Sequence, residues 1–215
     1  MSKKCFIVGL LILSASLVAT AVLYPSLPGR VPTHWDLQGQ IDGYSAKWTL
    51  FVFGPGILAA LLGMFAALPW LSPRQFTVDT FRSTYLYIVV VTLAVVAYFH
   101  ALVLWAAQGG HVDITKAMWG GACLLVALLG NVMGKVRRNF WIGVRTPWTL
   151  ANERVWYATH RFAAKTMVLG ALTSLVVSFA GAPFWVLFAT LMAGVLAPAI
   201  HSLVYYKHLE RRGEV

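Results

Sequence analysis

Long apolar runs separated by short polar segments dominate the chain. No charged side chain occurs within residues 5–29, 48–73, 83–112, 117–134 or 166–206. A transmembrane helix needs about 20 apolar residues to cross a hydrocarbon core that is roughly 30 Å thick. Each of the five runs approaches or exceeds this length. The pattern therefore predicts a multi-pass membrane protein.

The last run, residues 166–206, is long enough for two crossings, since its 41 residues would measure about 60 Å as one helix. Gly181, Ala182 and Pro183 lie near its middle, and glycine with proline marks a break between helices. We therefore expect an all-α membrane protein with six transmembrane helices. Their predicted bounds are about 5–24, 51–71, 84–107, 117–133, 166–181 and 184–206.

Composition supports this class, because 59% of the residues are hydrophobic and only 11% are charged, against about 25% charged in soluble domains. The two cysteines, Cys5 and Cys123, are too few for a disulfide framework or a four-cysteine zinc site. The net charge of +10 is interpreted as a topology signal, and no direct nucleic-acid contact is expected.

The basic residues predict the orientation of the helices. With six crossings, 14 of the 17 lysines and arginines fall on the side that holds both termini. Positive residues are retained in the cytoplasm, so both termini are expected there. The three on the opposite, outer side are Arg30, Lys47 and Lys116. Lys3, Lys4 and the small residues Ala19 to Ala21 also resemble a cleaved secretory signal, but the 19-residue apolar stretch exceeds a typical signal core and favours a retained helix.

The predicted spans contain no lysine, arginine, aspartate or glutamate, and His100 and His201 are their only candidate ionisable groups. Ion-coupled transport usually needs such groups inside the membrane. We expect both histidines to be hydrogen-bonded packing residues, which argues against a small-solute transporter and leaves it as an alternative. Pro55, Pro69 and Pro198 are expected to kink or end helices.

The outer loop, residues 25–48, is rich in proline and glycine, which predicts extended segments joined by turns. His34, Asp36 and Asp42 are the chain's clustered candidate metal ligands, and they could equally serve a membrane-embedded enzyme. No nucleophile with a partnered base accompanies them. The alternative is a network that fixes the loop, in which Asp42 caps a turn and Lys47 pairs with a carboxylate.

The inner loop, residues 134–165, carries seven basic residues and one acid, Glu153. Thr149 or Asn152 can cap a helix that begins near Glu153. Trp156 and His160, four residues apart, would share one face of this helix. The basic residues Arg154, Arg161 and Lys165 would line another face, and we expect the helix to lie along the inner membrane surface before the fifth crossing. Contact with anionic lipid explains the charges, whereas the remaining polar residues favour docking of a cytoplasmic partner.

Two motifs in these loops are similar to known families. Leu27-Pro28, Val31 to Trp35, Gly39, Asp42 to Tyr44 and Lys47 resemble a small membrane domain of unknown function that often precedes the SdpI domain. Gly130-Asn131, Asn139 to Leu150, Val155-Trp156 and Thr159-His160 resemble the core of the SdpI family. The resemblance implies an N-terminal membrane domain over residues 1–72 and an SdpI-like domain over residues 73–215.

The resemblance also implies a multi-pass protein of the bacterial inner membrane, without a cofactor. Its expected role is immunity to a membrane-active peptide toxin, membrane sequestration of a cytoplasmic transcriptional repressor, or both. Candidate contacts for toxin or ligand in the outer loop are His34, Trp35, Asp36, Gly39, Asp42 and Lys47. Candidate docking residues in the inner loop are Asn139, Gly143, Arg145, Thr146, Pro147, Trp148, Trp156 and His160.

Overall fold

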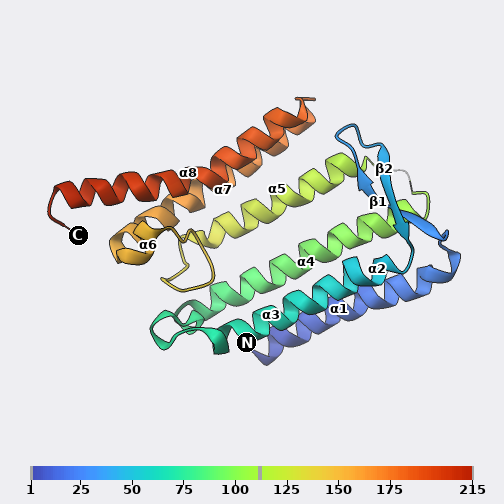
Figure 1. Ribbon diagram of the computed structural model, residues 1–215, viewed down its shortest axis with the longest axis horizontal. Coiled ribbons are helices and arrows are strands. Elements are labelled where there is room, and N and C mark those ends of the chain that lie inside the picture. Colours follow the sequence, from blue (N-terminus) through green and yellow to red (C-terminus); the bar gives the residue numbers. More distant parts are fainter. Residues whose placement is uncertain (1, 111–112, 215) are drawn as a thin grey trace. The chain divides into compact units, whose positions relative to one another are not determined.

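The protein is described by a computed structural model that places residues 2–110 and 113–214. Within these residues, six helices are long and apolar enough to cross a membrane, which confirms the predicted number (Figure 1). The chain divides into two compact units, one formed by Met1–Ala67 with Ile88–Ala122 and the other by Leu68–Tyr87 with Cys123–Val215. The predicted domain boundary near residue 72 stays a prediction.

The N-terminal unit begins with α1 (Lys3–Leu23), whose first turn is capped by the Ser2 hydroxyl, 3.2 Å from Cys5 N. A short 3-10 helix (Tyr24–Ser26) leads to the strands β1 (Arg30–Trp35) and β2 (Ile41–Ala46). The second crossing joins α2 (Thr49–Phe51), a π-helical segment (Val52–Gly56) and α3 (Ile57–Leu71). Pro55 lies in the π-helical segment and has no N–H to donate, so the helix widens there without ending.

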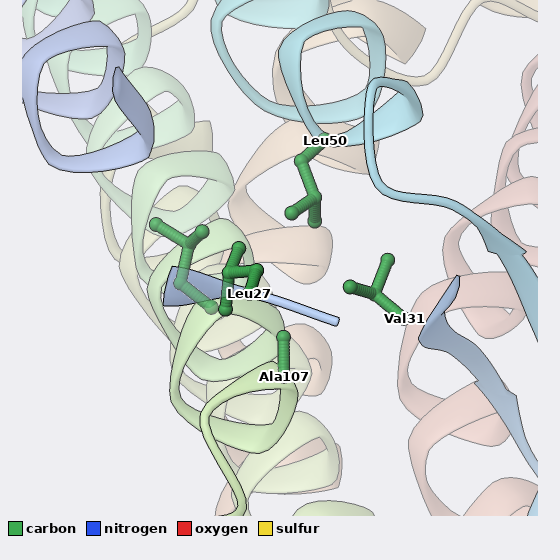
Figure 2. Close-up of a cluster of buried hydrophobic side chains, with 5 residues drawn as sticks. Leu27, Val31, Leu50 and Ala107 are labelled. Carbon is green, nitrogen blue, oxygen red and sulfur yellow. The ribbon is translucent and has the colours of Figure 1, made fainter. Parts of the chain in front are cut away.

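Strands β1 and β2 form an antiparallel hairpin where the sequence predicted extended segments and turns. Arg30 pairs with Ala46, Val31 with Ser45 and Pro32 with Tyr44, and the register shifts around His34. The hairpin is anchored by a buried apolar cluster in which Leu27, Val31, Leu50 and Ala107 point toward one another (Figure 2). Removing this apolar area from water, or from the polar headgroup layer, fixes the hairpin against the helices of its own unit.

The helices α4 (Arg82–Ala107) and α5 (Ile114–Met133) each continue from one unit into the other. Two 3-10 helices, Arg74–Phe76 and Val78–Phe81, precede α4. The C-terminal unit then holds α6 (Pro147–Ala151), α7 (Glu153–Phe179) and α8 (Phe184–Arg211). Pro69 and Pro198 lie inside α3 and α8, and neither ends its helix.

Helices α7 and α8 form the predicted antiparallel pair, drawn in orange and red in Figure 1. The break falls at Gly181, whose φ of 76° closes a turn in which Ala182 N donates to Val177 O. Along the pair, Gly170 and Gly194 face each other so closely that a Cβ on either would overlap the opposite backbone. Small residues allow this approach, as is usual between membrane helices.

One expectation about the inner loop was wrong. The helix that begins at Glu153 does not turn before the fifth crossing, because α7 is continuous from Glu153 to Phe179. No proline interrupts this stretch, and Gly170 is its single glycine. At 27 residues the helix measures about 40 Å, which is longer than a perpendicular crossing of the hydrocarbon core requires.

Candidate functional site

The outer hairpin is closed by Asp36. Its Oδ1 accepts hydrogen bonds from Gln38 N at 2.9 Å and Gln40 N at 2.8 Å, and its own N–H donates to Gln40 O. Gly39, with a φ of 80°, supplies the backbone conformation that the turn requires. Asp36 therefore caps the turn, a role that the sequence assigned to Asp42.

Lys47 fastens the base of the hairpin without a carboxylate partner, contrary to the expectation. Its Nζ donates to the carbonyl oxygens of Tyr24 and Leu27, at 3.1 and 3.2 Å, and lies 4.5 Å from the centre of the Tyr24 ring. Two carbonyl dipoles and the face of an aromatic ring stabilise the ammonium group. Among residues 2–110 and 113–214, no carboxylate forms an ion pair with Lys47, and Asp36 and Asp42 are bound elsewhere in the hairpin.

The three candidate metal ligands do not converge. His34 Nδ1 and Asp42 Oδ1 are 2.5 Å apart on the exposed face of the hairpin, whereas Asp36 is directed into the turn. Across residues 2–110 and 113–214, no group of three or more histidine, cysteine, aspartate or glutamate side chains could hold a metal ion. Trp35 pairs with Ile41 across the hairpin, so the six outer-loop candidates share one small hairpin but play separate parts.

The inner segment, which we define as residues 134–152, is folded around Asn139. This side chain has no exposed surface and makes four hydrogen bonds, which is its full capacity. Its Nδ2 donates to Arg137 O and Ile142 O, each at 2.9 Å. Its Oδ1 accepts from the backbone N–H groups of Trp141 and Ile142. One side chain thus replaces the backbone pairing that a helix or strand would provide.

His160, a residue of α7, fixes the next turn of the inner segment, at Gly143 and Val144. Its Nδ1 is 2.8 Å from Trp156 O and its Nε2 accepts from Val144 N at 3.0 Å, which defines the neutral Nδ1–H tautomer. The Trp156 ring stacks on His160 with ring centres 4.0 Å apart, and its Nε1 donates to Val136 O. Gly143 has a φ of 111°, and a Cβ there would overlap the imidazole. The shared face predicted for Trp156 and His160 is confirmed.

The inner segment ends in the short helix α6. Thr146 and Thr149 form a reciprocal capping box, and Pro147 occupies the first helical position. The Thr149 hydroxyl also donates to Val144 O at 2.8 Å. The Thr146 hydroxyl lies 2.8 Å from Ser202 Oγ of α8. Asn152, one of the two capping residues that the sequence offered, then caps α7 by accepting from Arg154 N and Val155 N.

Six of the eight predicted docking residues divide into two groups, whereas Gly143 and Thr146 serve the internal contacts described above. Asn139, Trp156 and His160 have no exposed surface, so they position the segment and do not reach a partner in this conformation. Arg145 and Pro147 are exposed and Trp148 is half-buried. Arg145 also donates to Phe140 O. Among the predicted docking residues, these three have side chains that another molecule could reach, and we call them the docking face.

A basic cavity of about 510 Å³ lies next to the inner segment. Its polar lining comes from Arg137, Arg154, Tyr157, Arg161 and Tyr205. Arg154, Tyr157 and Arg161 are spaced by three and four residues along α7, so they share one face of the helix. The Arg137 guanidinium lies over the Tyr157 ring at 5.4 Å. Three guanidinium groups around one cavity favour an anionic group as its occupant.

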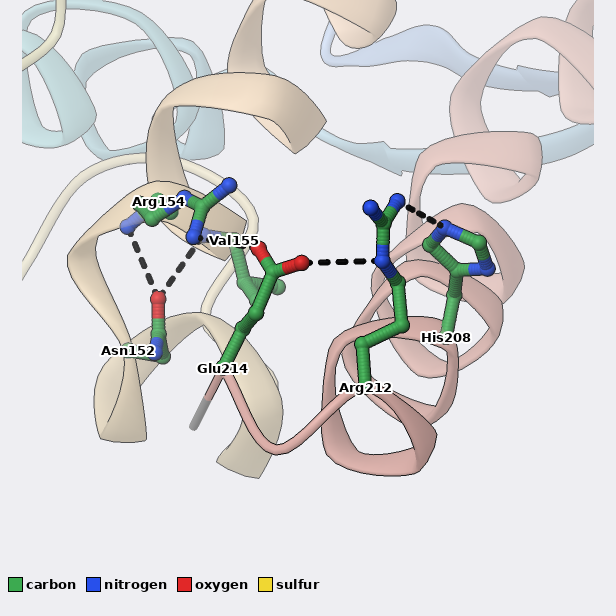
Figure 3. A network of polar contacts seen from close by, with 6 residues as sticks. All are labelled: Asn152, Arg154, Val155, His208, Arg212 and Glu214. Atoms are coloured by element: carbon green, nitrogen blue, oxygen red, sulfur yellow. Dashed lines mark hydrogen bonds and ion pairs between the residues drawn. The ribbon is translucent and has the colours of Figure 1, made fainter.

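Glu214, near the end of the chain, already neutralises part of this charge. Its carboxylate accepts from Arg154 Nη1 and Arg212 Nε, both at 2.8 Å, in the network of Figure 3. The hydrogen bond from Arg154 and the nearby positive charge of Arg212 lower the pKa of Glu214 below its ordinary value of 4.5. His208 lies beside Arg212 in the same network, with 3.5 Å between Nε2 and Nη1.

The sequence identified the arginines of this cavity but missed Tyr157, Tyr205 and Glu214. Tyr157 could have been found, because it lies on the α7 face between Arg154 and Arg161. Tyr205 belongs to α8 and Glu214 follows that helix, so only the folded α7–α8 pair brings them to the cavity.

The fold and the two polar segments define a class of protein, namely a multi-pass bacterial membrane protein with a structured hairpin and a folded polar segment. Residues 135–202 match the SdpI/YfhL protein family, and residues 11–59 match the domain of unknown function DUF1648. These two matches confirm the predicted resemblance: a region similar to the SdpI/YfhL family follows a region similar to DUF1648.

Among curated proteins, the chain is similar to the immunity protein SdpI of Bacillus subtilis (strain 168). The two are 26% identical over 206 residues, which cover 95% of this chain and 96% of that protein. No solved structure matches the chain. The similarity therefore includes the hairpin, all six candidate spans and the inner segment.

Proposed function

We propose that this protein confers immunity to a membrane-active peptide toxin and relays the presence of the toxin to a cytoplasmic transcriptional repressor. The observation that carries the proposal is the similarity to an immunity protein over nearly the whole of both chains. A match of this extent includes both polar segments, and surface segments of this kind commonly carry the function of a membrane protein.

For the toxin contact, the hairpin offers a suitable surface. Leu37, Ile41, Tyr44 and Trp48 are large apolar side chains that remain exposed on it or directly after it. Exposed apolar side chains close together mark interaction sites, and aromatic residues contribute most to such contacts. By the distribution of basic residues, this hairpin is expected on the outer side, where a secreted peptide would arrive.

For the repressor, the inner segment supplies the docking face of Arg145, Pro147 and Trp148, and its Arg137 also lines the basic cavity. The buried bonds of Asn139 and His160 hold this face in one conformation before any partner binds. A preformed surface loses little conformational freedom on binding. The arginines favour an acidic surface on the partner.

The proposal is tested in the source bacterium by deleting the gene and exposing cells to a panel of membrane-active peptides. We expect greater sensitivity to at least one peptide, and rescue by the unaltered gene supplied in trans. Trp48→Ala should rescue poorly, whereas Trp185→Ala, which removes an exposed tryptophan at the start of α8, should rescue fully. If deletion changes the sensitivity to none of the peptides, the immunity proposal is wrong.

The relay is tested separately by measuring transcripts that rise when cells meet the peptide. The double variant Arg145→Ala and Trp148→Ala should keep peptide resistance but lose the transcriptional response. Lys207→Ala, which changes an exposed basic residue outside the docking face, is the matched control. A normal transcriptional response in the double variant would exclude the docking face as the repressor contact.

A further inference from the structure

A second cavity lies in the N-terminal unit and serves none of the roles proposed above. It has a volume of about 510 Å³ and is lined by residues of the hairpin, the second crossing and α4. Its walls are mainly the apolar side chains Leu50, Phe53, Ile57, Val96, Phe99 and Val103, with Thr33, Ser45 and His100 as the polar members. Cavities of this size with a few polar groups are typical of small-molecule sites.

The three polar residues that line the cavity differ in whether they have a free hydrogen-bonding atom. Thr33 Oγ1 and Ser45 Oγ lie 3.1 Å apart and pair with each other. His100 is 95% buried, and its Nε2 lies 2.8 Å from Thr20 Oγ1. The Thr20 hydroxyl donates its single proton to Ser16 O at 2.8 Å, so it must accept from the N–H of His100. This leaves His100 Nδ1 as a bare acceptor, with no hydrogen-bond partner among the residues that the structure describes.

The second crossing is shaped to accommodate the imidazole. A Cβ on Gly54 would overlap the His100 ring, so glycine is the residue that lets the ring lie there. Gly54 belongs to the π-helical segment Val52–Gly56, which also presents Phe53 to the cavity. Short π-helical segments are uncommon and occur frequently at functional sites.

The chemistry of the cavity specifies its occupant. An imidazole nitrogen that lines an apolar cavity without a donor lacks the hydrogen bond that it would make in water, and the apolar walls provide no donor for Nδ1. Phe53 and Ile57 are 57% and 39% exposed on a candidate membrane span, so we infer that a molecule dissolved in the hydrocarbon can reach the cavity at these two residues. We propose that this cavity binds a small membrane-dissolved amphiphile, an apolar body with one hydroxyl group, and that the hydroxyl donates to His100 Nδ1.

The experiment uses the full-length protein in phosphatidylcholine nanodiscs with the photoreactive alcohol 3-azioctanol as the probe. We expect mass spectrometry to find the label concentrated on Phe53, Ile57, Val96, Phe99 and Val103. Octanol should compete for this labelling about tenfold better than methyl octyl ether at equal mole fraction in the bilayer, because the ether lacks the donor and one hydrogen bond is worth roughly that factor.

His100→Phe should abolish the tenfold preference for the alcohol, whereas Val176→Phe, a change on an exposed face of α7, should preserve it. The comparison of alcohol and ether in the unaltered protein needs no variant, so the test survives a folding defect in His100→Phe. Equal competition by the two compounds, or label spread evenly along the spans, would overturn the proposal and leave water as the partner of Nδ1.

Discussion

Single buried polar side chains determine the conformation of the inner segment. Asn139 makes every hydrogen bond that its amide allows, and His160 uses both ring nitrogens to connect Val144 with Trp156. Removing one member of such a pair leaves the other buried without a partner, which costs more than the bond itself contributes. The segment is therefore sensitive to changes that would be harmless at its surface.

Gly143→Ala should destabilise the protein more than Gly181→Ala. Both glycines have positive φ, so both substitutions strain the backbone by about 1–2 kcal/mol. At Gly143 the new Cβ also overlaps the His160 ring, whereas the space around Gly181 is open. Overpacking adds about 1–3 kcal/mol. Thermal unfolding of the two variants in detergent measures the difference, and equal melting temperatures would contradict the contact with His160.

The contact between Glu214 and Arg154 should depend on pH. Because Arg154 lowers the pKa of Glu214, the contact contributes fully above the ordinary value of 4.5 and is lost as the pH falls through the lowered pKa of the folded protein. The chain has three glutamates, so carbon-13 NMR of labelled glutamate can follow this carboxyl. Arg154→Gln should return its titration toward the ordinary value, and an unchanged titration in that variant would exclude the ion pair.

For the helices and strands, the length of the apolar runs predicted the structure better than the pattern of polar residues in the loops did. All six spans were found because hydrocarbon thickness sets the length of an apolar helix. The predicted turn between the helix that begins at Glu153 and the fifth crossing was wrong, because charged residues, which ended the apolar run, do not end a helix. The capping residue Asn152 was predicted correctly, since capping depends on neighbouring residues alone. The carbonyl partners of Lys47 and the Arg154 partner of Glu214 are distant in the sequence, so local patterns could not identify them.

The pairing of α7 and α8 gives an element-scale prediction. Gly194→Val should weaken the pair, because its side chain would overlap the backbone of Thr166 and Gly170. In lipid, such close packing replaces the hydrophobic effect as the source of helix association. Gly120→Val in α5, where a Cβ meets no neighbour, is the matched control.

Disulfide crosslinking between introduced cysteines on α7 and α8 measures this effect, with thermal stability as a second readout. The yield should fall for Gly194→Val and stay unchanged for Gly120→Val. Equal yields in the two variants would show that the glycine contact does not hold the pair together.

For the whole molecule, orientation is the prediction on which both proposed contacts depend. Gln38→Cys in the hairpin should react with an impermeant maleimide on intact cells, whereas Arg211→Cys near the end of α8 should react only after permeabilisation, because basic residues are retained in the cytoplasm. Both positions are exposed. Cys5 and Cys123 are buried, so the unaltered chain serves as the unlabelled control. Reversed labelling would exchange the sides on which toxin and repressor are expected.

The hydroxyl contact between Thr146 and Ser202 connects the long helix α8 to the cap of the short helix α6. Helix α8 has 28 residues. Successive residues of an α-helix are about 100° apart around its axis, so a shift of α8 by one residue relative to its neighbours turns each side chain to another direction. A shift of one or two residues would carry Ser202 away from Thr146, the residue that caps α6. A force on the N-terminal end of α8 that changed the register of the helix would therefore break the contact that holds α6 and the docking face. Ser202 lies about 30 Å along the helix from that end.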